Sequence, residues 1–152
     1  MTIEARIAER GITLTEPAKA VANYVPFVQT GGVVHISGQL SNDASGGVKG
    51  TVGMNVTPEQ ANAAARLCGV NLLAQIKAAC DGDLDRVVRI VKLGGFVQAG
   101  PDFEAIPAVI NGCSDLMVEV FGDAGRHARS AVGVYKLPLG FAVEIDAIVE
   151  IR

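Results

Sequence analysis

The chain has 152 residues, of which 49% are hydrophobic and 19% are charged, and its formal net charge is −3. This composition excludes a disordered chain, and the length fits one domain over residues 1–152 with a sizeable core. The basic residues are scattered singly apart from Arg126–Arg129, so a nucleic-acid-binding surface is not indicated.

Three cysteines, Cys68, Cys80 and Cys113, have neither CxxC nor Cys/His metal-binding spacing. Cys68 and Cys80 fall in one predicted helix, about 18 Å apart, which is too far for a disulfide. The two histidines and the unclustered acids give no metal site, and no loop has phosphate-binding spacing. No apolar run approaches the roughly 20 residues of a membrane span, and no secretion signal is recognised. We therefore expect a cytoplasmic protein with free thiols and without membrane contact, metal or organic cofactor.

The first third of the chain predicts a short helix, a β-hairpin and a loop. Ile3–Arg10 places apolar residues on one side, which favours a helix. Val25–Gln29 and Val33–Ser37 are rich in strand-forming residues and flank Thr30-Gly31-Gly32, which is typical of a hairpin turn. Ser41–Met54 is rich in glycine and serine, so we expect a surface loop that could cover a site.

Two longer helices follow. Thr57 can cap the first, Pro58 fits its first position, and Gln60 completes a capping box. Its apolar residues recur every three or four positions as far as about Cys80. The second helix begins at Asp102 or Pro107 and ends at Phe121-Gly122.

Three further strands are predicted, at Val87–Leu93, Ser130–Lys136 and Phe141–Ile151. Leu137–Gly140 contains a proline and a glycine between the last two, which predicts a terminal hairpin. In the last strand, every second residue from Phe141 to Ile151 is apolar, and Glu144 is on the other face. The order of elements predicts an α+β fold in which two helices pack on one face of a mixed β-sheet.

The terminal strands also carry a family resemblance. Ala128-Arg129-Ser130, Leu137-Pro138 and Val143-Glu144-Ile145, in that order, resemble the C-terminal signature of the RidA/YjgF family. Tyr24 and Ile36-Ser37-Gly38-Gln39 agree with this signature, and the resemblance runs from about Pro17 to Arg152. It implies a chorismate-mutase-like fold, hydrolysis of reactive enamines and imines, and homotrimers with sites between subunits. The chain looks like a longer branch of the family, with extended segments at Asn42–Met54 and around Gly112–His127.

Arg129 and Glu144 are the candidate catalytic residues. A guanidinium group binds carboxylate bidentately, so Arg129 could anchor a 2-imino acid. Glu144 could orient the water that attacks the C=N carbon, with burial raising its pKa. Without the resemblance, we would interpret Arg129 as a surface arginine or as part of an inter-subunit ion pair, and Glu144 as an ordinary sheet-surface glutamate.

Three further residues are candidates for substrate binding. Tyr24 resembles the family's tyrosine near the ligand, although it could be an ordinary edge aromatic. Asn111 resembles the family's asparagine in the second helix, with one residue more between it and Arg129. Gly133 leaves open space that would suit a pocket floor, or it allows close packing.

Two neighbouring positions depart from the family pattern. His127 stands where many relatives have proline, and we interpret it as a residue at the rim of the site. Ala131 stands where many relatives have cysteine, so thiol chemistry is absent there. The other histidine, His35, is interpreted as structural.

The predicted terminal hairpin gives a register that can be checked. It places Gly133 opposite Glu144 and Arg129 opposite Ile148. Arg129 and Glu144 would then share one face of the sheet, about 13 Å apart. One small ligand could not bridge that distance easily, which favours a site between chains.

We therefore expect a homotrimeric hydrolytic deaminase that converts 2-imino acids or enamines to 2-oxo acids and ammonia. The alternative is a non-catalytic, regulatory trimer that binds a carboxylate metabolite and in which Glu144 is dispensable. Ribonuclease activity, known for some members of the family, fits poorly with a net charge of −3.

Overall fold

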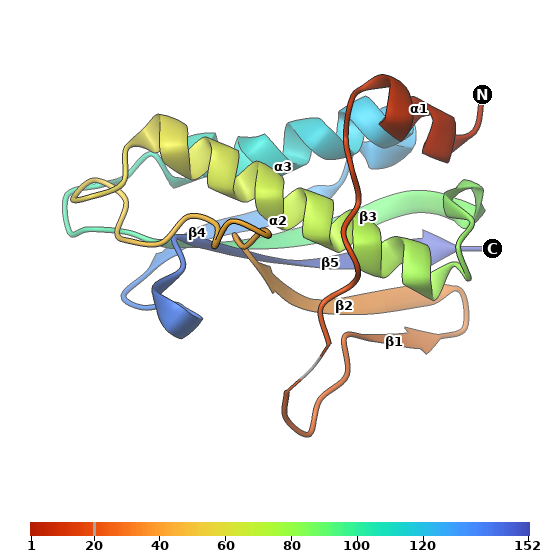
Figure 1. Cartoon of the computed structure of the whole chain (residues 1–152), viewed down its shortest axis with the longest axis horizontal. Helices are drawn as coiled ribbons and strands as arrows, with labels where there is room; N and C mark the ends of the chain where they lie inside the picture. Colours follow the sequence, from red (N-terminus) through yellow and green to blue (C-terminus); the bar gives the residue numbers. More distant parts are fainter. Residues whose placement is uncertain (20) are drawn as a thin grey trace.

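The computed structural model describes residues 1–19 and 21–152, which form a five-stranded sheet covered by helices on one side (Figure 1). Ala20, in the Ala/Val-rich segment before Tyr24, lies outside the described residues. The strand order in the sheet is β1-β2-β5-β3-β4. The elements are α1 Ile3–Glu9, β1 Phe27–Thr30, β2 Val33–Leu40, α2 Pro58–Ala79, β3 Val87–Gln98, α3 Ile106–Phe121, β4 Ala128–Val134 and β5 Val143–Ile151.

The predicted helices and their local signals are confirmed. The Thr57 hydroxyl accepts a hydrogen bond from the Gln60 backbone N–H, and the Gln60 side chain accepts one from the Thr57 N–H, which completes the capping box of α2. Of the two predicted starts of α3, the one at Pro107 is correct, because Pro107 lies in its first turn. The short helix α1 packs against α3, where Arg6 Nη1 donates to the Val120 carbonyl at 2.9 Å.

The first predicted hairpin is confirmed, with Thr30 of β1 paired to Val33 of β2. The predicted terminal hairpin is wrong. β3 lies between β4 and β5, pairing in parallel with β4 and antiparallel with β5. The helix α3 returns the chain to the end of the sheet at which β3 begins. β4 therefore runs parallel to β3, and the two strands and α3 form a crossover unit. The connection after β4, residues 135–142, therefore crosses the end of β3 instead of making a tight turn.

A buried glutamine holds this crossing in place. Gln98, the last residue of β3, is 2% exposed. Its amide Nε2 donates to the Gly50 carbonyl at 2.9 Å and its Oε1 accepts from the Leu137 N–H at 2.8 Å. The side chain thus ties the long loop before α2 to the crossing connection.

We expect Gln98→Ala to lower the free energy of unfolding by about 2 kcal/mol, because partly buried backbone groups at Gly50 and Leu137 lose their partners. Urea denaturation of both proteins would measure this loss. Gln29→Ala is the matched control, since Gln29 is exposed and, within the part of the chain that the structure describes, its side chain bonds just the nearby Gly31 carbonyl. The control should change stability by no more than about 0.5 kcal/mol, and an equal loss in both variants would contradict the role of Gln98.

The two long helices approach each other closely through glycines. A Cβ atom added to Gly112 of α3 would lie 2.0 Å from the backbone carbonyl oxygen of Asn62 in α2. One turn away, the Asn62 side chain donates to the Ala108 carbonyl at 2.9 Å. A Cβ atom added to Gly69 would lie 2.8 Å from Cδ2 of Leu116.

In the described part of the chain, no helix is long and apolar enough to cross a membrane.

Candidate functional site

The helices cover one face of the sheet, and the other face is open. Arg129 lies on the covered face and Glu144 lies on the open face. Arg129 is paired with Leu93, which is paired with Ala147, and both of these neighbours are buried under the helices. Glu144 is three residues from Ala147 on β5 and therefore on the opposite face. Across β3, Arg129 is aligned with Ala147, whereas the predicted hairpin aligned it with Ile148. This difference of one residue reverses the faces, so the prediction that Arg129 and Glu144 share a face is wrong.

Arg129 is half-buried between β4 and α3. Its Nη1 donates to Asn111 Oδ1 at 2.8 Å and to Ser114 Oγ at 3.1 Å. Asn111 and Ser114 are three residues apart on α3, so both face β4. The contact with Asn111 forms despite the extra residue in the spacing. Among residues 1–19 and 21–152, the hydrogen bonds of Arg129 involve Nη1, which leaves the edge formed by Nε and Nη2 for a ligand.

An open cleft of about 290 Å³ lies beside this guanidinium. The residues that line it come from α3, from the connection before β4 and from the start of β4: Ser114, Asp115, Val118, Arg126, His127 and Arg129. His127 lines the cleft and also contacts α3, since its Nε2 lies 2.9 Å from Ser114 Oγ and its Nδ1 lies 2.6 Å from the Gly125 carbonyl oxygen. Sequence reasoning missed this contact, although His127 and Arg129 have the spacing of one strand face.

Glu144 lies on the open face together with Asp146. Burial raises the pKa of Glu144 above its ordinary value, and the charge of Asp146 raises it further. Burial also raises the pKa of Asp146, while a backbone hydrogen bond from Gly94 and the charge of Lys92 oppose that shift. A half-buried carboxyl group of this kind can hold or release a proton nearer neutral pH than an exposed one.

Two glycines make room for these carboxylates. A Cβ atom on Gly38 of β2 would lie 2.8 Å from the carboxyl carbon of Glu144. A Cβ atom on Gly94 of β3 would lie 2.4 Å from Oδ1 of Asp146. Side chains at either position would displace a carboxylate from the sheet surface, so the glycines fix where the acids lie. Sequence reasoning noted Gly38 only as part of a motif and did not connect Asp146 with the site.

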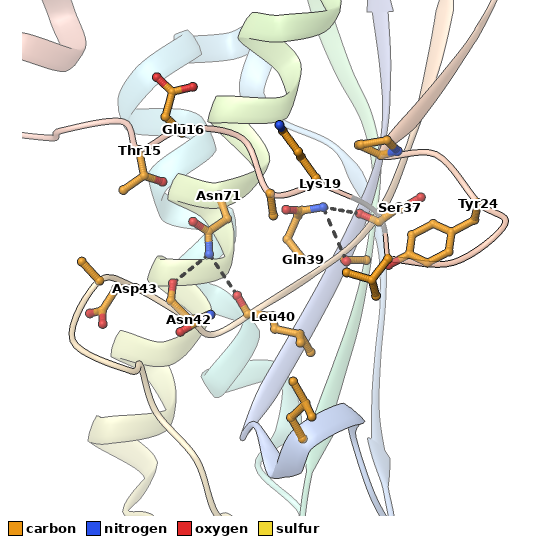
Figure 2. A pocket seen from close by; sticks show the side chains of 16 residues that line it. Thr15, Glu16, Lys19, Tyr24, Ser37, Gln39, Leu40, Asn42, Asp43 and Asn71 are labelled. Atoms are coloured by element: carbon orange, nitrogen blue, oxygen red, sulfur yellow. Dashed lines mark hydrogen bonds between the residues drawn. The ribbon is translucent and has the colours of Figure 1, made fainter.

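Tyr24 lies at the β2 side of the molecule and is 53% exposed. It lines a cavity of about 530 Å³, and Figure 2 shows it at the same end as Ser37, with Asn42 and Asn71 at the other end. Gly38 of β2 also lines this cavity and lies next to the Glu144 side chain. Tyr24 and Glu144 are therefore both near β2. Two strands separate β2 from β4 and its Arg129, a span of about 14 Å at the usual strand spacing.

Gly133 is not the floor of a pocket under Glu144. It is paired with Val97 and faces α3, where an added Cβ atom would lie 3.3 Å from Cδ1 of Ile106. The other histidine, His35, is exposed on the open face and is paired with Ile148 and Val28.

Three acids that are scattered in the sequence come together in the structure. The carboxylates of Glu4, Asp83 and Asp85 lie within 4.8 Å of one another. Each already accepts a hydrogen bond from a backbone N–H, which ties the start of α1 to the turn before β3. This geometry accounts for the cluster as a structural contact.

A model of the family described as "YjgF/chorismate_mutase-like, putative endoribonuclease" matches residues 4–148. The chain belongs to the RidA/YjgF family. The chorismate-mutase-like fold expected from the sequence is therefore confirmed, with α1 as a short third helix.

Two curated relatives cover most of this RidA/YjgF chain. "Protein TCP17" from Trypanosoma cruzi is 47% identical over 99% of this chain and 94% of its own. A 2-iminobutanoate/2-iminopropanoate deaminase from Dermatophagoides farinae is 32% identical over 87% of this chain and 88% of its own. Among solved structures, a protein of unknown function from Agrobacterium tumefaciens is 49% identical, with a TM-score of 0.92 over 99% of this chain and 94% of that one.

Proposed function

We propose that this RidA/YjgF protein is a hydrolytic deaminase that converts 2-imino acids and enamines to 2-oxo acids and ammonia. The observation that carries the proposal is the guanidinium of Arg129, which lines an open cleft, is held through Nη1 and, among the described residues, has no hydrogen bond on its Nε/Nη2 edge. That edge matches the two oxygens of a carboxylate. The relative from Dermatophagoides farinae that is named as an imine deaminase supports the reaction class.

In the proposed mechanism, Arg129 binds the substrate carboxylate and thereby fixes the position of the neighbouring C=N carbon. Glu144 accepts a proton from water as the water oxygen attacks that carbon, and it passes the proton to the nitrogen. The resulting carbinolamine then gives its hydroxyl proton to Glu144, which passes it to the amine nitrogen, and the C–N bond breaks as the C=O bond forms, so that a 2-oxo acid and ammonia leave. Tyr24 contributes a hydroxyl group to the pocket. The reaction consumes only water and needs no metal or cofactor.

The positions of these residues support a site built by two subunits. Within one chain the sheet separates Arg129 from Glu144 and Tyr24, so a single copy cannot bring them to one ligand. We infer a homotrimer in which the β4 edge of one copy meets the open face of the next. Exposed apolar side chains on β1, β3 and β4 support burial of that region: Val28, Val88, Val91 and Val132. In the cytoplasm, such an enzyme would remove imines released by other enzymes.

The deaminase proposal is tested by measuring 2-oxo acid and ammonia release from freshly generated 2-iminopropanoate, relative to the uncatalysed rate. Acceleration by the wild type supports the proposal. Absence of acceleration with several 2-imino acids would overturn it. The molecular mass in solution, measured by light scattering, tests the trimer separately.

The regulatory trimer remains the second candidate because Arg129 keeps a carboxylate-binding edge on the face away from Glu144. In that case a 2-oxo acid would raise the melting temperature without any turnover, and Glu144→Ala would leave its affinity unchanged.

Activity should also depend on the protonation of Glu144. Because burial and Asp146 raise its pKa above the ordinary 4.5, and only the deprotonated carboxylate can accept a proton from water, kcat should fall as pH drops through this raised pKa. We expect the acidic limb of the kcat profile to have its midpoint above pH 4.5. Glu144→Gln should lower kcat by about 100-fold at neutral pH and remove the limb.

The uncatalysed rate is subtracted at each pH, because the imine itself titrates. A wild-type kcat in Glu144→Gln would contradict the role of Glu144 in proton transfer.

A further inference from the structure

A chain of hydrogen bonds runs from Gly125, in the short turn after α3, to Arg129. The Gly125 carbonyl oxygen lies 2.6 Å from His127 Nδ1, and His127 Nε2 lies 2.9 Å from Ser114 Oγ. Ser114 Oγ accepts from Arg129 Nη1 at 3.1 Å, and the same Nη1 donates to Asn111 at 2.8 Å. Three hydrogen bonds therefore join a backbone carbonyl to the guanidinium, and a fourth joins the guanidinium to Asn111.

The direction of each hydrogen bond follows from the chemistry of the groups. A carbonyl oxygen can only accept, so Nδ1 of His127 must carry the proton. In a neutral imidazole, Nε2 is then an acceptor, and the Ser114 hydroxyl must donate to it. The lone pairs of Ser114 Oγ are left to accept from Arg129. Gly125 thus determines which way the Ser114 hydroxyl points.

We propose that Ser114 and His127 are positioning residues that hold Arg129 for side-on binding of the substrate carboxylate. Nη1 carries two hydrogens, and Asn111 and Ser114 provide one acceptor for each. With both engaged, the plane of the guanidinium is fixed and its Nε/Nη2 edge is the one that meets the ligand. This inference rests on the proposed function for the identity of the ligand as a carboxylate.

The pair acts through preorganisation rather than through contact with the reacting atoms. A free arginine side chain must lose rotamer freedom when it binds an anion, and a guanidinium that is already held loses less. Asn111 is exposed, whereas Ser114 and His127 are half-buried. His127 is also held by its hydrogen bond to the Gly125 backbone carbonyl. Loss of the pair should therefore weaken carboxylate binding and leave the chemical step unchanged.

The test compares Ser114→Ala, His127→Ala and His127→Gln with the wild type. The measurements are KM and kcat for 2-iminopropanoate, and the Kd for pyruvate by isothermal titration calorimetry. We expect the two alanine variants to raise KM and Kd by roughly five- to tenfold while kcat changes by less than about twofold. His127→Gln should bind nearly as well as the wild type, because its amide also offers one donor and one acceptor. Ser45→Ala, which removes a hydroxyl group from an exposed loop, is the matched control.

Nitrogen-15 NMR of the imidazole gives a measurement that is independent of turnover. The wild type should show His127 protonated at Nδ1 and not at Nε2. Observation of the other neutral form would overturn the proposal, as would an unchanged Kd in both alanine variants. If the wild type binds pyruvate without turnover, the deaminase function fails, while the Kd values of the variants still decide the positioning role. If the wild type binds no carboxylate, both proposals are overturned.

Discussion

Arg129→Ala is expected to lower kcat/KM for 2-iminopropanoate hydrolysis by about 1,000-fold. The substitution removes a guanidinium that lines the α3–β4 cleft and that two hydrogen bonds already orient. The substrate would lose both its anchor and the fixed position of its reactive carbon. Steady-state kinetics against the uncatalysed rate would measure the loss.

Arg129→Lys should recover only part of the activity, because an ammonium group keeps the charge but cannot bind a carboxylate with a planar pair of donors. Arg10→Ala serves as the matched control, since Arg10 is exposed and its ion pair with Glu119 is long at 3.9 Å. The control should keep wild-type kinetics. Activity of Arg129→Ala within about threefold of the wild type would exclude Arg129 as the anchor.

Gly112→Ala is expected to lower the free energy of unfolding by about 3 kcal/mol. Alanine is favoured over glycine in a helix by about 1 kcal/mol, yet the new methyl group would lie 2.0 Å from the Asn62 carbonyl oxygen. This neighbour is backbone and cannot move alone, so α2 and α3 must separate and their shared core must loosen. Chemical denaturation, with the slope checked for equality to the wild type, would measure the change.

Gly69→Ala is the matched comparison in the same helix pair. Its new methyl group would meet Cδ2 of Leu116 at 2.8 Å, which is the end of a side chain that can change its rotamer. The gain in helix propensity then offsets much of the crowding, and stability should stay within about 1 kcal/mol of the wild type. Equal losses in the two variants would show that the backbone contact at Gly112 is not what limits the helix spacing.

Local signals in the sequence predicted the elements well. The capping box at Thr57 and Gln60 and the proline in the first turn of α3 act within a few residues, so they can be read without knowledge of the fold. The alternation of apolar residues along β5 likewise predicted its buried face, which the structure confirms.

The neighbours of each strand could not be predicted in the same way. The proline and glycine between β4 and β5 are compatible with a tight turn, but they do not exclude a third strand between the two. The resulting one-residue difference in register placed Arg129 and Glu144 on opposite faces. The contacts of His127 were missed for a related reason: its partners are a backbone carbonyl and a serine from another element, and neither forms a sequence motif.

The position of β5 has a consequence for how the protein is made. β5 follows every other strand in the chain, yet it lies at the centre of the sheet and pairs with both β2 and β3. The β1–β2 hairpin and the β3-α3-β4 unit can each form while synthesis continues, but without β5 both leave an unpaired edge and an uncovered apolar surface. The sheet closes only after β5 has left the ribosome, so we expect both unpaired edges to be prone to aggregation until that point.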